Sequence, residues 1–291
     1  MNNQEFAQLT QQGLVILDGA TGSNLTKAGM PKGISTELWT LEHAEVLIKL
    51  QREYVEAGTQ IVYAPTFAAN RISLANYGMA DKVEELNTRL VGISKEAVGG
   101  RAYIAGDLTT TGKLMEPKGE ITYEELLEAY IEQITALANA GVDLLVAETM
   151  MCVDEMMVAL DAAQSVCDLP VLCSMTVEAD GSGFFGGNAV EAMESLQEMG
   201  AAAVGINCSM GPDQMEAVVA SMKRIARIPV IAKPNAGMPV INERGEAIYN
   251  MEAGVFAKHM PSLVEAGAGV IGGCCGTDPD YIRAMVAAVK K

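Results

Sequence analysis

The sequence predicts an α/β protein with a (β/α)8 barrel, the TIM-barrel architecture, formed as one domain over residues 1–291. Three observations predict it: eight short apolar runs alternate with longer helical segments, glycines follow the helices just before the next run, and no linker-like or low-complexity tract divides the chain. Parallel strands need helical crossovers, so this alternation favours a parallel sheet. Eight such units favour a closed barrel over an open, doubly wound sheet.

The predicted strands, in chain order, are residues 14–17, 60–64, 102–106, 142–147, 170–175, 202–206, 229–232 and 269–271. The helices between them place polar and apolar residues at three- and four-residue spacing, and they include residues 42–57, 122–140, 190–199, 213–225, 251–266 and 280–290. Thr122 followed by Glu125 is a capping-box pattern at a helix start. Left-handed glycine caps are expected to end four helices, at Gly58, Gly141, Gly200 and Gly267.

An open sheet of the nucleotide-binding type is the alternative architecture. It would carry a GxGxxG turn after the first strand, and residues 18–23 (DGATGS) resemble that turn only loosely. No Walker GK[ST] motif occurs in the sequence. The closed barrel is therefore the better prediction.

The charge of the chain restricts its partners. The formal net charge is −17, from 37 acidic and 20 basic residues. A field of this sign repels phosphate backbones and anionic lipid surfaces, so neither nucleic acid nor a membrane is expected as a partner. The first residues lack the basic and apolar regions of a secretory signal, and no run approaches the roughly 18 apolar residues of a spanning helix. We expect a soluble, cytoplasmic protein.

Unusual polar residues follow the predicted strands repeatedly, which is where functional groups gather in a barrel. They are Asp18, Thr66 and Asn70, Asp107, Glu148, Asn207 and Cys208, Lys233 to Asn235, and Cys274 and Cys275. The end of the sixth strand and the end of the eighth are separated only by the seventh. The sequence therefore brings Cys208, Cys274 and Cys275 to one part of the rim.

These three cysteines predict a metal site. Glycines on both sides of Cys274 and Cys275 free the backbone to turn, so that two adjacent side chains can face one ion. Three thiolates without an evident fourth protein ligand are typical of a catalytic zinc site with an open position, and soft sulfur ligands select Zn²⁺ over magnesium or calcium. The remaining thiols, Cys152, Cys167 and Cys173, are expected to be inert packing residues.

An open zinc site could activate water for hydrolysis or bind a substrate thiol as its fourth ligand. His43 and His259 both fall in helical segments away from strand ends, which disfavours hydrolysis. A free thiol with a pKa of about 8.5 is mostly protonated at neutral pH, and zinc displaces that proton. Three thiolates also keep the bound sulfur electron-rich, so the site favours alkylation of sulfur.

Three motifs carry a resemblance to a known family: DGATG (residues 18–22), GINCS (205–209) and GGCCGT (272–277). Together with Thr66-Phe67, Glu148-Thr149-Met150 and KPNAG (233–237), they resemble the homocysteine S-methyltransferase family over about residues 10 to 288. That family includes the homocysteine-binding domain of cobalamin-dependent methionine synthase and the betaine– and S-methylmethionine–homocysteine methyltransferases. The resemblance implies a zinc barrel with Cys208, Cys274 and Cys275 as the metal ligands.

The resemblance also implies a substrate site for L-homocysteine. Asp18 and Glu148 are expected to receive its amino-acid end through charge-assisted hydrogen bonds. Backbone N–H groups of Gly19, Ala20 and Thr21 are expected at its carboxylate. Asn207 and Asn235 complete the predicted substrate residues, and whether Lys233 or Asn235 contacts the substrate or braces its loop stays open. No catalytic side chain is expected beyond the zinc-activated thiolate.

The methyl donor is the open question. S-methylmethionine, a betaine-like compound and methylcobalamin on a separate corrinoid protein are the candidates. No DxHxxG cobalamin motif occurs and few residues follow Thr277, so no cobalamin domain is expected here. Methylation of another thiol and a homocysteine-binding subunit of a larger methyltransferase are the functional alternatives. The glycine-rich segment Gly181–Asn188 is either a mobile flap or a phosphate cradle, and its lack of a lysine disfavours the cradle.

Overall fold

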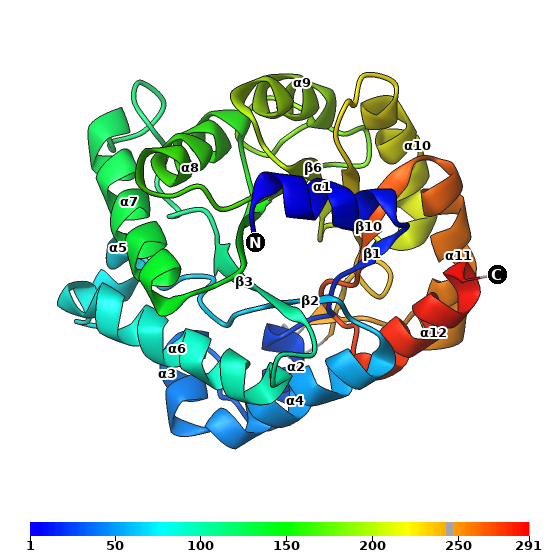
Figure 1. Ribbon diagram of the computed structural model, residues 1–291, viewed down its shortest axis with the longest axis horizontal. Helices are drawn as coiled ribbons and strands as arrows, with labels where there is room; N and C mark the ends of the chain where they lie inside the picture. Colours follow the sequence, from blue (N-terminus) through cyan, green and yellow to red (C-terminus); the bar gives the residue numbers. More distant parts are fainter. Residues whose placement is uncertain (243–246, 291) are drawn as a thin grey trace.

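Eight parallel strands form one closed sheet in the computed structural model, which describes residues 1–242 and 247–290 (Figure 1). The strands are β1 (Val15–Ile16), β2 (Ile61–Tyr63), β3 (Tyr103–Leu108), β4 (Leu144–Met150), β5 (Val171–Met175), β6 (Ala203–Asn207), β7 (Val230–Lys233) and β10 (Ala268–Ile271). Their order is β1-β10-β7-β6-β5-β4-β3-β2, and a parallel bridge from Leu17 to Ile61 closes the ring. The predicted barrel and all eight predicted strands are confirmed; residues 243–246 and 291 of the predicted domain lie outside the described residues.

A ring of helices surrounds the sheet (Figure 1). It consists of α4 (Ala44–Ala57), α6 (Val83–Val98), α7 (Tyr123–Ala140), α8 (Val153–Val166), α9 (Ala189–Met199), α10 (Pro212–Lys223), α11 (Ala253–Glu265) and α12 (Pro279–Val289). Shorter helices are α1 (Asn3–Gln11), α2 (Gly22–Lys27), α3 (Thr36–Glu42), α5 (Arg71–Ala75) and the 3-10 turn η1 (Ala80–Lys82). The six predicted helices are confirmed, while α6 and α8 complete the ring without having been singled out.

Local sequence explains the sharp return from helix to strand. Thr122 and Glu125 form the expected reciprocal capping box at the start of α7. Gly58, Gly141 and Gly200 end their helices with φ of 110°, 74° and 96°. Only glycine adopts this left-handed conformation without steric cost, so these positions turn the chain directly into the following strand.

The barrel interior is closed at one end by α1. Phe6 is 1% exposed and packs with Val15, Leu17, Ile61 and other inward-facing strand residues. Figure 1 shows α1 lying across the end of the barrel. Met1 and Glu5 share a surface depression with Asp143, which directly precedes β4, so α1 covers the amino ends of the strands. The opposite end, where the predicted site residues lie, stays accessible.

A small antiparallel pair, β8 (Val240–Ile241) with β9 (Ala247–Ile248), extends from the segment after β7. The sequence does not predict this pair, because each strand has only two residues and both are exposed. Across the described residues, no helix combines the length and the apolar character needed to cross a membrane.

Candidate active site

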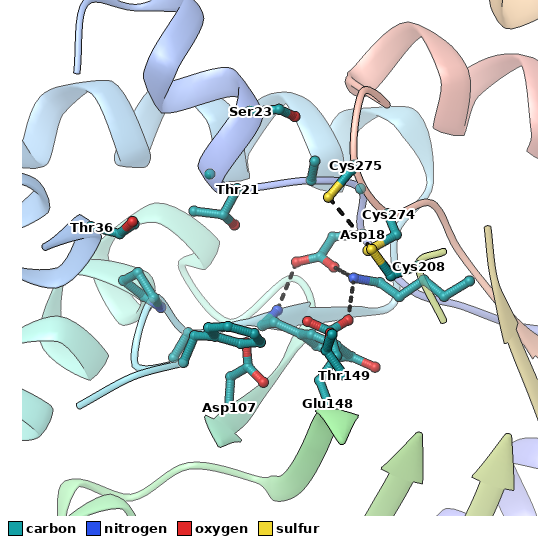
Figure 2. Close-up of a pocket in the computed structure, with 18 of the residues that line it drawn as sticks. Asp18, Thr21, Ser23, Thr36, Asp107, Glu148, Thr149, Cys208, Cys274 and Cys275 are labelled. Carbon is teal, nitrogen blue, oxygen red and sulfur yellow. Dashed lines mark hydrogen bonds and ion pairs between the residues drawn. The ribbon is translucent and has the colours of Figure 1, made fainter. Parts of the chain in front are cut away.

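A cavity of ≈ 270 Å³ opens at the carboxyl ends of the barrel strands (Figure 2). Most of the predicted site residues line it: Asp18, Gly19, Ala20, Thr21, Glu148, Cys208, Cys274 and Cys275. This volume is close to the lower end of ligand pockets, about 300 Å³, so the cavity suits a ligand no larger than a small metabolite. Lys233, Tyr63, Asp107 and Thr149 also form its wall.

The three predicted cysteines come together on one side of this cavity. Their sulfurs all lie within 4.8 Å of one another, and Cys208 Sγ is 3.8 Å from Cys275 Sγ. Sulfurs bound to one tetrahedral zinc ion at about 2.3 Å lie about 3.8 Å apart. The donor set and its spacing therefore fit zinc with one open position.

Backbone geometry aims the sulfurs at one point. Cys208 leaves β6 with φ of 61°, a left-handed conformation that is uncommon outside glycine, and its N–H donates to the carbonyl of Lys233. The N–H of Cys274 donates to the carbonyl of Pro234, and the carbonyl of Cys275 accepts from Ala236. Both sides of the cluster are thus fixed to the segment that follows β7.

Gly276 shows why glycine follows the cysteine pair. Its φ is +83°, and an added Cβ would lie 2.4 Å from Cβ of Tyr249. The Tyr249 side chain interacts with Cys275 and contributes to lowering the pKa of that thiol. The expected glycine-assisted turn is confirmed at this position.

The thiols act on one another strongly. Hydrogen bonds from Cys208 and then Cys274 lower the pKa of Cys275 to about 3. The hydrogen bond with Cys208 lowers the pKa of Cys274, but the interaction with Cys275 and burial outweigh it and raise that pKa to about 11. By contrast, burial alone raises the pKa of Cys173 to about 12, as expected for an inert thiol in β5. Hydrogen bonds with its two neighbours raise the pKa of Cys208, so Cys275 is the thiol of the cluster that has thiolate character on its own.

The buried carboxylates Asp18 and Glu148 share one cation, Lys233. Lys233 Nζ lies 2.9 Å from Glu148 Oε1 and 3.4 Å from Asp18 Oδ1, and it lies 4.3 Å from the Tyr63 ring centre. Burial raises the pKa of Asp18 to about 6, although Lys233 and the N–H of Tyr63 oppose the shift. Burial would lower the pKa of Lys233, but the Glu148 and Asp18 carboxylates outweigh it and raise that pKa. Lys233 is therefore a fixed internal counter-ion.

Glu148 and the next residue both face the cavity because β4 is irregular there. The pairing of β4 with β5 shifts register between Ala147 and Met150, and Thr149 has φ of 58°. A β-branched residue rarely adopts this conformation, which costs roughly 1–3 kcal/mol when the surroundings impose it. Figure 2 shows Glu148 and Thr149 together beside the cysteines. No pattern in the sequence predicts this bulge.

Two predicted substrate residues do not line the cavity. Asn207 is fully buried and bonds Thr149, Ser174 and Cys274. Asn235 is 1% exposed, and its side-chain oxygen has no hydrogen-bond partner within the described residues. Their contact with a substrate stays a prediction.

The predicted backbone donors after β1 are partly occupied. Ala20 N–H donates to Thr277 Oγ1, whereas Thr21, Gly22 and Ser23 begin α2 on the cavity wall. The first N–H groups of a helix have no partner inside it. Gly19 leaves no room for a side chain, since an added Cβ would lie 2.6 Å from the Tyr54 hydroxyl.

Other singled-out residues lie elsewhere. The segment Gly181–Asn188 folds back through a bridge between Ser182 and Asn188, and Gly183 bridges to Val177. The segment does not line the cavity. His43 stacks on Trp39, with ring centres 4.1 Å apart, and His259 lies in α11. Thr36 and Glu37 of α3 reach the cavity wall although no strand end marks them in the sequence.

Comparisons with known proteins bear on this site. The family model described as Homocysteine S-methyltransferase matches residues 15–289. Methionine synthase of Mycobacterium leprae (strain TN) is 30% identical over an alignment covering 99% of this chain and 25% of that protein. Methionine synthase of Mycobacterium tuberculosis (strain ATCC 25618 / H37Rv) is 28% identical, covering 98% and 25%. The chain thus spans about a quarter of the length of these relatives.

Solved structures share the fold. The oxidized form of the homocysteine methyltransferase MmuM from Escherichia coli aligns with a TM-score of 0.82 at 21% identity, covering 99% of both chains. Its metallated form aligns with a TM-score of 0.80 at 21% identity, covering 97% of this chain and 98% of that one. The carboxyl transferase domain of Rhizobium etli pyruvate carboxylase is more distant, with a TM-score of 0.55 at 12% identity, covering 99% and 49%.

A closed parallel barrel with a sulfur-lined cavity at the carboxyl ends of its strands has the fold and the site position of a barrel enzyme. The match over residues 15–289 then makes the family plain: the chain belongs to the homocysteine S-methyltransferase family.

Proposed function

We propose that this chain acts as one barrel domain that transfers a methyl group to the sulfur of L-homocysteine, forming methionine, with Zn²⁺ held by Cys208, Cys274 and Cys275. One observation carries the proposal: three sulfurs with zinc-compatible spacing border a small cavity that also contains buried carboxylates. Membership of the homocysteine S-methyltransferase family supports the choice of acceptor.

The chemistry divides between the metal and the chain. Zinc bound to these sulfurs would lower the pKa of a substrate thiol and orient its sulfur as the nucleophile. The chain holds the remainder of the amino acid: buried carboxylates attract the ammonium, and N–H groups at the start of α2 suit the carboxylate. Because α1 closes the other end, the donor has to approach at the open end of the barrel.

Zinc K-edge X-ray absorption with and without L-homocysteine tests the proposal. The expected result is a rise from three sulfur ligands plus one lighter atom to four sulfur ligands. L-Methionine is the matched control, because it has the same amino-acid end but no thiol, and it should leave the sulfur count at three. A protein that retains no zinc, or a sulfur count that ignores homocysteine, would overturn the mechanism.

The donor is settled by turnover of the zinc-loaded protein with three donors in parallel. Turnover with S-methylmethionine or with betaine alone identifies a small-molecule donor. Turnover only after addition of a methylcobalamin-loaded corrinoid protein identifies a two-component system, which the likeness to methionine synthases favours. Homocysteine binding without methylation under any condition would support a binding subunit, and preference for another thiol would revise the acceptor.

Six cysteines, with three gathered as ligands, suit a reducing compartment such as the cytoplasm.

A further inference from the structure

Cys208 and Ser209 form a strained turn directly after β6. Their φ angles are 61° and 54°, both in the left-handed region. Residues with a Cβ disfavour this region, so two in succession persist only where their surroundings impose the conformation. Thr149, on the cavity wall, is the only other non-glycine residue in the described part of the chain with a positive φ. Strain of this kind is thus found beside the cysteine cluster.

The Ser209 hydroxyl fixes this turn to the neighbouring strand. Ser209 Oγ lies 2.7 Å from Thr176 Oγ1 and accepts from the N–H of Val177 at 3.2 Å. Both partners directly follow β5, where Thr176 is 5% exposed and Val177 is fully buried. The N–H of Thr176 in turn donates to the carbonyl of Met150, the last residue of β4. One hydroxyl therefore ties the turn to the ends of two strands.

Backbone hydrogen bonds hold the turn from its other side. The N–H of Cys208 donates to the carbonyl of Lys233 at 3.1 Å, and the carbonyl of Met210 accepts from the N–H of Asn235 at 2.9 Å. These bonds do not involve the side chain at position 209, so a substitution there leaves their donors and acceptors in place. Loss of the Ser209 hydroxyl would release the turn on the side of β5 and leave it held on the side of β7.

The turn decides where the Cys208 sulfur points. Adjacent residues of an extended strand point to opposite faces. The left-handed Cys208 leaves that pattern, and its sulfur reaches the cavity wall 3.8 Å from Cys275 Sγ (Figure 2). Zinc binds sulfur at about 2.3 Å and tolerates little displacement of a ligand. The anchor of the turn therefore bears on metal binding, although Ser209 itself does not line the cavity.

We infer that Ser209 is a positioning residue for Cys208: its hydroxyl holds the left-handed turn that aims the Cys208 sulfur at the metal. The inference rests on the proposed function, because it concerns the affinity of the zinc site. A competing explanation is that the hydroxyl only satisfies the buried N–H of Val177 and so stabilises the fold. Glycine separates the two roles, since it lacks the hydroxyl but adopts a left-handed backbone freely.

Competition with a chromophoric chelator measures the zinc affinity of Ser209→Ala and Ser209→Gly. Alanine removes the hydroxyl and keeps the unfavourable Cβ, so Ser209→Ala should bind zinc about 10-fold more weakly, as when a group that orients a metal ligand is lost. Ser209→Gly should stay within about threefold of the wild-type affinity, because glycine keeps the turn without an anchor. Ser221→Ala and Ser221→Gly are the matched controls: Ser221 donates to the carbonyl of Ala217 within α10, and neither variant should change zinc affinity.

A double variant shows whether Ser209 acts through Cys208. Once Cys208→Ser has removed the sulfur, the addition of Ser209→Ala should weaken zinc binding no further. Thr176→Val removes the partner hydroxyl and leaves Ser209 intact. This variant should also weaken zinc binding, and it replaces Ser209→Ala if that protein does not fold.

The outcomes separate the claims. A lower urea midpoint of zinc-free Ser209→Ala with wild-type zinc affinity would overturn the inference, because the role would then be structural alone. An equal loss of affinity in Ser209→Ala and Ser209→Gly would also overturn it, since the left-handed turn would not be what matters. A further loss in the double variant would show that Ser209 acts through another residue, with the same consequence. Failure of the wild-type protein to bind zinc would instead overturn the proposed function.

Discussion

The side-chain amide of Asn207 joins Cys274 to Thr149: its Nδ2 atom lies 3.7 Å from Cys274 Sγ and 2.7 Å from Thr149 Oγ1. Its Oδ1 atom accepts from Thr149 N–H at 3.0 Å and from Ser174 Oγ at 2.9 Å. One buried amide thus fixes a sulfur of the cluster and the strained residue of β4. Asn207 therefore positions residues that line the cavity without lining it itself.

Replacement of Asn207 by Ala should weaken zinc binding about 10- to 100-fold, because groups that orient metal ligands contribute at this level. Competition with a chromophoric chelator measures the change. Asn87→Ala is the matched control: Asn87 is equally buried but bonds the carbonyls of Ala69 and Val83. Equal loss of zinc affinity in both variants would show that the effect is general destabilisation.

Serine replacement of Cys208, Cys274 or Cys275 should each reduce the zinc content of the purified protein well below one ion per chain. An alcohol at these positions does not supply the thiolate that zinc prefers. Cys173→Ala is the control, since Cys173 is fully buried in β5 and belongs to no metal-ligand cluster of the part of the chain that the structure describes. Metal analysis gives the answer directly, and a full zinc complement in all three serine variants would contradict the ligand assignment.

Gly276→Ala should lower the free energy of unfolding by about 1–3 kcal/mol, because a side chain at φ of +83° is strained and its Cβ would contact Tyr249. Gly254→Ala, in the first turn of α11 with nothing within 4 Å of the added Cβ, should instead be neutral or stabilising by up to about 1 kcal/mol. Urea denaturation compares the two. Equal urea midpoints for Gly276→Ala and Gly254→Ala would mean that a side chain at position 276 is not strained.

Asp18 should make stability depend on pH. Its pKa is about 6 in the folded protein against 3.8 as the ordinary value. The folded state therefore holds a proton that the unfolded state has released, and stability relative to Asp18→Asn is greatest below about pH 4 and declines as the pH rises through 6. The total change approaches about 3 kcal/mol. Urea denaturation midpoints of the wild-type protein and of Asp18→Asn, measured between pH 4 and 7, test this change. An increase in wild-type stability relative to Asp18→Asn with rising pH would contradict the assignment.

The strands could be predicted from the sequence because each one is a short apolar run between glycine-capped helices. The cysteine cluster was readable for a related reason: a closed barrel brings its strand ends together, so Cys208 and the Cys274–Cys275 pair had to approach one another. The pair β8–β9 was not readable, since Val240, Ile241 and their partners are exposed and too few to form a pattern.

The finer layout of the site depends on side-chain directions that spacing does not define. Asn207 and Cys208 are adjacent, yet the first points behind the wall and the second into the cavity, because Cys208 turns into a left-handed conformation. The role of Lys233 as the counter-ion of two carboxylates could not be predicted from the sequence either. Its contacts with Asp18 and Glu148 depend on how β1, β4 and β7 lie across the barrel.

Strand β10 is the last of the eight along the chain, and it pairs with β1, the first. Cys274 and Cys275 follow directly, whereas Cys208 precedes them by more than sixty residues. While a ribosome is still making the chain, Cys208 therefore stands alone as a single weak ligand. The complete thiol trio exists only after the final strand has emerged and the ring has closed. Under the proposed function, loading of the metal would then be a late event in maturation that requires a correctly closed barrel.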